Sequence, residues 1–126
     1  LSAAHATLKI LAETHAQQTI NHAGEQIQAV LGRVFTAAGL EHAFAGPPAM
    51  FGIHFSATVP TNYRDWRVTN SELYRKFAWE LIARGVMLEP DSREPWFICE
   101  AHQHMDLGWL EDVATQSIRV ALAAKD

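Results

Sequence analysis

The stretch that decides the fold reads AQQTINHAGEQIQAVLGRVFTAAG and spans residues 16–39. Its apolar residues recur at spacings of three and four, the period of one helix face, for about six turns. Thr14 and Gln17 form a capping-box pattern, so we expect the helix to begin at Thr14, and Gly39 is a suitable C-terminal stop. Its inward face is expected to comprise Ala16, Ile20, Ala23, Ile27, Val30, Leu31, Val34 and Ala38.

The segments on either side of this helix have different patterns. Residues 1–12 are rich in Ala and Leu, with apolar residues at helical spacing, and predict a short helix. Residues 41–45 predict a short strand, and residues 49–57 predict a second strand that pairs with it as a hairpin. Alternation in the second strand places three side chains on one face: Phe51, Ile53 and Phe55.

The second half of the chain predicts two more helices and two more strands. After a loop over residues 58–68, the capping-box pair Thr69 and Glu72 opens a helix that Gly85 stops. Short apolar strands are expected on either side of a turn over residues 90–95, and Asp106 can cap a last helix. The two strands are expected at Val86–Leu88 and Trp96–Cys99. The helix after Thr69 should bury Leu73, Phe77, Leu81 and Ile82. The last helix should bury Leu107, Leu110, Val113, Ala114, Ile118 and Ala121.

This order of elements predicts an α+β fold in one domain over residues 1–126. We expect a two-layer sandwich, with a small, partly antiparallel sheet covered by helices on one face. The length of 126 residues is enough for one core without disulfides, and the single Cys99 allows no internal disulfide.

Composition excludes several classes of protein. The chain is 48% hydrophobic and 19% charged, with a net charge of -4, which argues against disorder and against a nucleic-acid partner. No apolar run approaches the ~20 residues that cross a bilayer, so we expect no membrane partner. The chain begins at Leu1 without Met, so we expect a processed or partial chain.

Two groups of side chains could carry chemistry but favour ordinary structural roles. Glu100, His102, His104 and Asp106 would converge on one face of an extended segment, as metal ligands do, but two histidines do not make a site. His15 and His22 share a helix face, which favours a polar stripe over a metal site. Cys99, in an apolar strand near Phe97, is expected to be a buried, inert thiol.

Glu94 lies in the turn between the two short apolar strands of the second half. A loop on a rigid scaffold is where functional side chains are often presented. The adjacent Arg93 and a solvated turn equally allow an ordinary surface carboxylate.

The order and spacing of short motifs in this chain resemble those of a known family. In chain order they are the opening Ala3-Ala4-x-Ala6-Thr7-Leu8, the strand Met50–Phe55, Asn62-Tyr63 with Asp65, Gly85-Val86-Met87-Leu88-Glu89-Pro90, Glu94, Phe97, and Ala101-His102 before an acid-led helix. Together they resemble the C-terminal segment of class III pyridoxal-phosphate aminotransferases, and within that class the glutamate-1-semialdehyde aminomutase family. The resemblance covers essentially all 126 residues.

This chain departs from the family pattern at several positions near its C-terminal end. Asp91 stands where the family usually has Ser, Arg93 where it has Phe, and Gln103 where it has Thr; Cys99-Glu100 replaces Ser-Leu or Ser-Ser. These differences leave open a transaminase acting on β-amino acids or other amino acids. Residues 96–100 also lack the Arg with which ω-aminotransferases grip a second carboxylate, which disfavours the ornithine and γ-aminobutyrate branches.

The resemblance implies that the chain is the C-terminal small domain of a dimeric, cytoplasmic enzyme, an aminotransferase or an aminomutase (an isomerase). It would close the active-site cleft over a small amino-acid substrate, with Glu94 and Phe97 near that substrate. Pyridoxal phosphate would be held by a Lys of a preceding large domain, against which the helix of residues 1–12 would pack as a connector. Lys9, Lys76 and Lys125 do not match that Lys, so we expect this chain alone to contain no catalytic residue, to hold no cofactor or metal and to be inactive.

Two alternatives remain open at this stage. The chain could be an independent, non-enzymatic α+β module that binds a partner or self-associates, or a His-dependent metal protein. On the family interpretation, the apolar excess in the composition should form an exposed patch that covers another surface.

Overall fold

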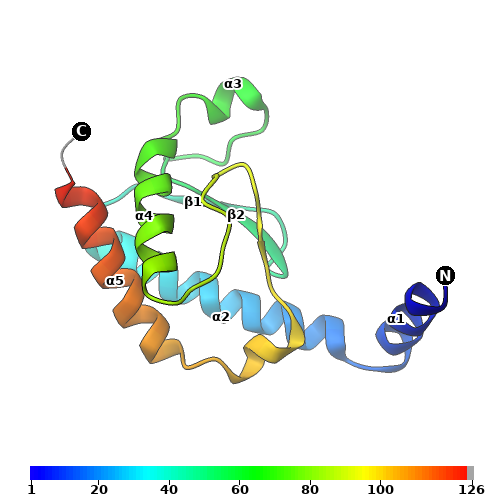
Figure 1. Cartoon of the computed structure of the whole chain (residues 1–126). Helices are drawn as coiled ribbons and strands as arrows, with labels where there is room; N and C mark the ends of the chain where they lie inside the picture. The colour runs from blue at the N-terminus through cyan, green and yellow to red at the C-terminus, as the bar shows by residue number, and fades with distance from the viewer. Residues whose placement is uncertain (125–126) are drawn as a thin grey trace.

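The computed structural model describes residues 1–124, which form helices packed on one small sheet (Figure 1). The predicted α+β class is confirmed. In chain order the elements are α1 (Ser2–Glu13), α2 (Ala16–Ala37), β1 (Ala43–Ala45), β2 (Met50–His54), α3 (Tyr63–Trp66), α4 (Ser71–Ala83), β3 (Trp96–Phe97), the 3₁₀ helix η1 (Glu100–His104) and α5 (Leu107–Ala123).

Helix α2 is the long helix that the apolar period predicts, and its inward face is wider than expected. Gly24 and Phe35 are buried with the predicted residues, whereas Ile20 and Ala38 are only half-buried. The helix ends as predicted, with Gly39 at φ 72°, a conformation that glycine adopts without steric cost.

Neither predicted capping box forms. The Thr14 hydroxyl donates to the Ile10 carbonyl at 2.7 Å and accepts the Ala16 N–H at 3.3 Å, so it joins the end of α1 to the start of α2. The N-cap of α2 is His15, which makes no side-chain bond to the helix. At α4 the cap is Asn70, whose side chain accepts the Leu73 N–H at 3.0 Å, in place of Thr69. An Asn one residue later is an equally good cap, and the pattern of Thr and Glu alone does not separate the two.

The sheet has the order β1-β2-β3 and both pairings are antiparallel. The hairpin is confirmed, with Phe44 opposite Ile53, and β3 pairs with the other end of β2 through Phe51 and Trp96. Residues 86–88 form no strand, which corrects the prediction: the Val86 N–H bonds the Leu81 carbonyl of α4 at 3.0 Å, and Val86 and Leu88 pack against the core from a loop. The predicted strand Trp96–Cys99 is shortened to its first two residues.

The helices α2, α4 and α5 enclose the core against the sheet. Helix α4 packs along α5, and α5 also packs against α2. Asp106 caps α5 as predicted, accepting the Trp109 N–H at 3.0 Å. The loop expected over residues 58–68 contains the short helix α3.

Helix α1 extends away from the rest of the chain and buries none of its residues (Figure 1). Leu8 and Ile10 are 66% and 55% exposed, and only Leu11 is half-buried. The role of residues 1–12 as a connector stays a prediction. Over residues 1–124, no helix is both long and apolar enough to span a bilayer.

A pair of glycines in α2 gives a matched test of this packing. A Cβ on Gly24 would lie 2.0 Å from the Pro48 carbonyl oxygen, whereas a Cβ on Gly32 would make only ordinary contacts, at 3.5 Å or more. We expect Gly24→Ala to lower the free energy of unfolding by about 1–3 kcal/mol, because backbone must move. Gly32→Ala should raise it by up to ~1 kcal/mol, the helix-propensity gain. Urea unfolding of both variants checks this, and equal effects would contradict the close approach of Gly24 to Pro48.

Buried His54 gives a test of how the stability of the fold depends on pH. Desolvation lowers the pKa of His54 below its ordinary value of 6.5, and its Nδ1 has no partner among the described residues. The unfolded chain therefore takes up the proton more readily, so the contribution of His54 to stability is complete above pH ~6.5 and falls below it. Between pH 7.5 and 5.5 we expect wild type to lose more stability than His54→Leu, measured by urea unfolding; parallel losses would contradict the burial of a neutral His54.

Candidate functional site

An open cavity of about 690 Å³ lies beside β3. Its walls come from the segment between α4 and the turn, from β3 and the residues just after it, and from the start of α5. Both residues that the sequence singled out, Glu94 and Phe97, line this cavity. Glu94 is exposed, and the Phe97 side chain is 70% exposed, so both are open to a molecule in the cavity.

The walls of the cavity combine aromatic rings with carboxylates. Trp96, Phe97 and Trp109 supply the rings, and Glu89, Asp91 and Glu94 supply the acids. Within residues 1–124, neither Lys nor Arg lines it. The wall can therefore contact apolar or cationic groups, and among its described residues it offers no Lys or Arg to a carboxylate.

The loop that carries Glu94 is tied together at its base by Tyr74 of α4. The Tyr74 hydroxyl donates to the Glu89 carbonyl at 3.2 Å and accepts the Trp96 indole N–H at 3.0 Å, so one side chain joins both ends of the loop. Burial raises the pKa of Tyr74 to about 12, so the hydroxyl keeps its proton at ordinary pH and remains a donor.

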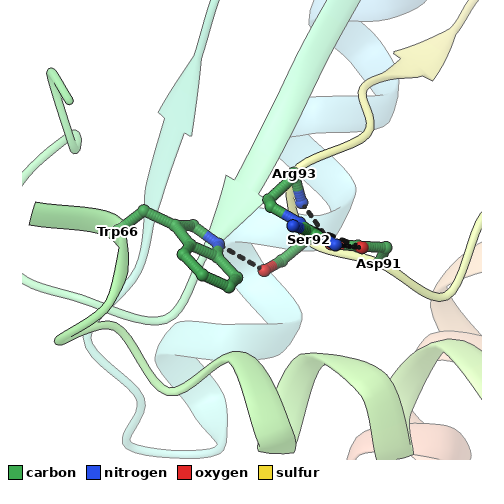
Figure 2. Close-up of polar contacts among 4 residues, drawn as sticks. All are labelled: Trp66, Asp91, Ser92 and Arg93. Carbon is green, nitrogen blue, oxygen red and sulfur yellow. Dashed lines mark hydrogen bonds and ion pairs between the residues drawn. The ribbon is translucent and has the colours of Figure 1, made fainter. Parts of the chain in front are cut away.

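The tip of the same loop is a tight turn with two bonded side chains (Figure 2). The Glu94 N–H bonds the Asp91 carbonyl at 3.0 Å, which closes the turn, and Arg93 forms an ion pair with the Asp91 carboxylate. That pairing lowers the pKa of Asp91, mainly through the hydrogen bond from Arg93. Asp91 and Arg93, which both depart from the family pattern, are thus an ion pair with each other.

Trp66 of α3 contacts the turn from outside the loop. Its indole N–H donates to the Ser92 hydroxyl at 2.9 Å, and the Arg93 guanidinium lies 5.2 Å from its ring centroid (Figure 2). Sequence reasoning singled out neither Trp66 nor Tyr74 as part of the site. For Trp66 the sequence offers one signal, an aromatic residue in a polar loop, and this does not reveal a contact with a residue 26 positions away.

Cys99 corrects a prediction. It is exposed, because β3 ends at Phe97 and the chain then turns into η1 with Cys99 as its N-cap. Its sulfur lies 3.2 Å from His102 Nδ1, and its backbone N–H bonds the same nitrogen at 2.9 Å. The thiol therefore belongs to a helix cap at the surface and not to the core.

The predicted geometry for a metal site also differs. Residues 100–104 form a 3₁₀ helix, so Glu100, His102 and His104 do not alternate onto one face of an extended segment. His15 precedes α2 and His22 lies 3.8 Å from Glu25, both at the surface. Among the described residues, no three His, Cys, Asp or Glu side chains gather as a metal would require.

The fold of this chain recurs within larger solved structures. The FumI protein of Sphingopyxis sp. MTA144, in its PLP internal aldimine form, superposes with a TM-score of 0.74 at 22% identity, over 93% of this chain and 25% of that one. An omega-transaminase from Sphaerobacter thermophilus gives a TM-score of 0.67 at 18% identity, over 83% and 24% of the two chains.

Sequence comparison points to particular relatives. The chain is 31% identical over 107 residues to glutamate-1-semialdehyde 2,1-aminomutase of Methanosarcina acetivorans, which covers 85% of this chain and 25% of the relative. The aminomutase of Archaeoglobus fulgidus is 27% identical over 118 residues, 94% of this chain and 28% of the relative. The resemblance found in the sequence is thereby confirmed, and the chain spans about a quarter of the length of these relatives. No protein-family model matches.

The described residues do not fit pyridoxal phosphate by themselves. Lys9 lies on the exposed helix α1, and the Lys76 amine on α4 donates to the Ala124 carbonyl at 3.2 Å. Neither lines the cavity, so neither can bind a cofactor there. Lys125 lies outside the described residues.

Proposed function

We propose that this chain is the C-terminal small domain of a pyridoxal-phosphate-dependent aminotransferase or aminomutase of the glutamate-1-semialdehyde aminomutase type. The parent enzyme would be a cytoplasmic homodimer acting on a small amino acid, with the cofactor held by the large domain of the same chain. The observation that carries the proposal is the joint position of Glu94 and Phe97, both exposed and both on the wall of one cavity.

In this role the domain supplies one wall of the cleft and no part of the cofactor site. Phe97 offers an apolar face, and the Glu94 carboxylate offers a hydrogen-bond acceptor and a negative charge to the part of the substrate that faces it. The absence of Lys and Arg from the described wall, whose one basic side chain is His102, favours binding the substrate carboxylate elsewhere, on the large domain. Glu94 and Phe97 would therefore affect orientation and specificity.

The test begins with the reading frame that contains this chain. We expect it to continue upstream of Leu1 for several hundred residues, and the complete protein to show absorbance of lysine-bound pyridoxal phosphate and to transfer or shift an amino group. The 126-residue chain alone should show neither with added cofactor. An initiator Met directly before Leu1 would favour the non-enzymatic module.

In the complete enzyme we expect Glu94→Gln to lower kcat/KM about tenfold or more without lowering the melting temperature, because the lost charge faces the substrate. Glu100→Gln is the matched control, since Glu100 is an exposed acid six positions away that does not line the cavity. Steady-state kinetics of both variants decide the point. Similar values of kcat/KM in the two variants would remove Glu94 from the proposed site.

Helix α1 gives a prediction for the isolated chain. Its apolar side chains are exposed, Leu8 by 66%, so they should associate with one another or bind hydrophobic dye. We expect Leu8→Glu to abolish most of that association in sedimentation experiments. Ala6→Glu adds the same charge on the side of the helix away from Leu8, one turn from Ile10, and should reduce association less. A wild-type chain that is monomeric and binds no dye would contradict the proposed packing of α1.

A further inference from the structure

Between Glu89 and Trp96, Ser92 is the only buried residue of the loop. The first part of the loop separates the large cavity from a second one of about 260 Å³, and Glu89 and Asp91 line both. A loop with open space on two sides keeps a single conformation only if its own polar groups are bonded to the scaffold. The position of the Glu94 carboxylate therefore depends on those bonds.

Tyr74 fixes the base of the loop but makes no bond to its tip. The tip is held by Ser92, which is only 4% exposed although it lies in a turn. Its hydroxyl accepts the indole N–H of Trp66 at 2.9 Å, the side-chain bond that ties the turn to another element (Figure 2). A buried hydroxyl that loses such a partner is costly, which makes the pairing specific.

Arg93 adds a second contact to the same ring. Its guanidinium lies 5.2 Å from the Trp66 ring centroid and also forms an ion pair with Asp91. Arg93 therefore links both neighbours of Ser92, Asp91 and itself, to the Trp66 ring. Tyr63 stacks against Trp66 with centroids 5.4 Å apart. The indole is thus held in place by an aromatic neighbour as well as by its hydrogen bond.

Helix α3, which carries Trp66, is itself fixed at its start. The Asn62 side chain accepts the N–H groups of Arg64 and Asp65 at 2.9 and 3.2 Å. The Asp65 carboxylate accepts the Thr61 hydroxyl at 2.7 Å and the Thr61 N–H at 3.0 Å, bonds that lower the pKa of Asp65. A helix this short needs such bonds to persist, and with them it provides a fixed support for the indole.

From these contacts we infer that Trp66 is a positioning residue for Glu94. Its N–H bond to Ser92 and its stacking with Arg93 hold the turn from Asp91 to Glu94 in one conformation, which sets where the Glu94 carboxylate lies on the cavity wall. The effect on the turn is a property of this chain; the effect on catalysis rests on the proposed function. Trp66 touches neither substrate nor cofactor in this scheme and acts only through Glu94.

The effect on the turn is tested on the 126-residue chain by amide hydrogen exchange. Trp66→Phe removes the N–H donor and keeps a ring, and Ser92→Ala removes the acceptor. We expect each to speed exchange of the Glu94 amide, which closes the turn, by about tenfold or more, with core amides such as that of Leu31 unchanged. The double variant should exchange no faster than either single one, because both remove the same bond.

Trp79→Phe is the matched control. Trp79 is a tryptophan on α4 that is 54% exposed and has no hydrogen bond to the described residues of the turn, so its replacement should leave Glu94 exchange unchanged. Wild-type exchange at Glu94 in Trp66→Phe, or equal acceleration in Trp79→Phe, overturns the inference regardless of what the enzyme does.

The catalytic consequence is tested in the complete enzyme with Glu94→Gln as background. Trp66→Phe should lower kcat/KM in the wild type and cause little further loss in Glu94→Gln, because Trp66 acts through that carboxylate. An equal further loss in Glu94→Gln overturns the positioning role, since a merely structural effect would persist there. A third outcome separates the two claims: Trp66→Phe speeds exchange of the Glu94 amide, but neither Trp66→Phe nor Glu94→Gln changes kcat/KM. That outcome supports the role of Trp66 in fixing the turn and contradicts the proposed function of Glu94.

Discussion

The structure depends above all on the ring of Phe35, which joins three elements at one point. It meets Phe55, just after β2, and Phe77 of α4 edge-on, with centroids 5.0 and 5.4 Å away, and His42 before β1 at 5.3 Å. Edge-to-face contacts fix orientation as well as distance, since the ring edge is positive and the face negative. The long helix, the sheet and α4 are therefore placed relative to one another by a single fully buried side chain.

This placement determines the site through α4. Phe77 points into the core, and one turn earlier Tyr74 reaches out of the same helix to the loop that carries Glu94. The loop touches the core mainly through that hydroxyl and through Trp96, which packs beside Phe51 of β2. The position of the cavity wall thus follows from packing between Phe35 and Phe77, and its detail follows from polar bonds made outside the core.

The core packing and the polar bonds of the cavity wall differ in how far the sequence predicts them. Periodicity predicts α2, α4, α5 and the hairpin, because burial of one face produces a local and repeated pattern. It does not distinguish Phe35 from its neighbours, nor does it show that residues 86–88 lack a partner strand, since both depend on elements distant in the chain. Glu94 can be selected from sequence by its place in a turn. Trp66 and Tyr74 cannot, because their bonds cross 26 and 15–22 positions and follow no period.

The composition of the cavity wall differs from that of a packing defect. Defects in cores are small and lined by buried apolar atoms. Here the wall carries exposed apolar side chains, Met87 at 98% and Phe97 at 70%, next to an exposed carboxylate whose loop is held by contacts among seven bonded or stacked residues. Exposed apolar surface is unfavourable in water, and ordering a loop opposes chain entropy. Both features would become favourable together if another body covered the wall and left a cleft at Glu94, as the proposed function requires of the large domain.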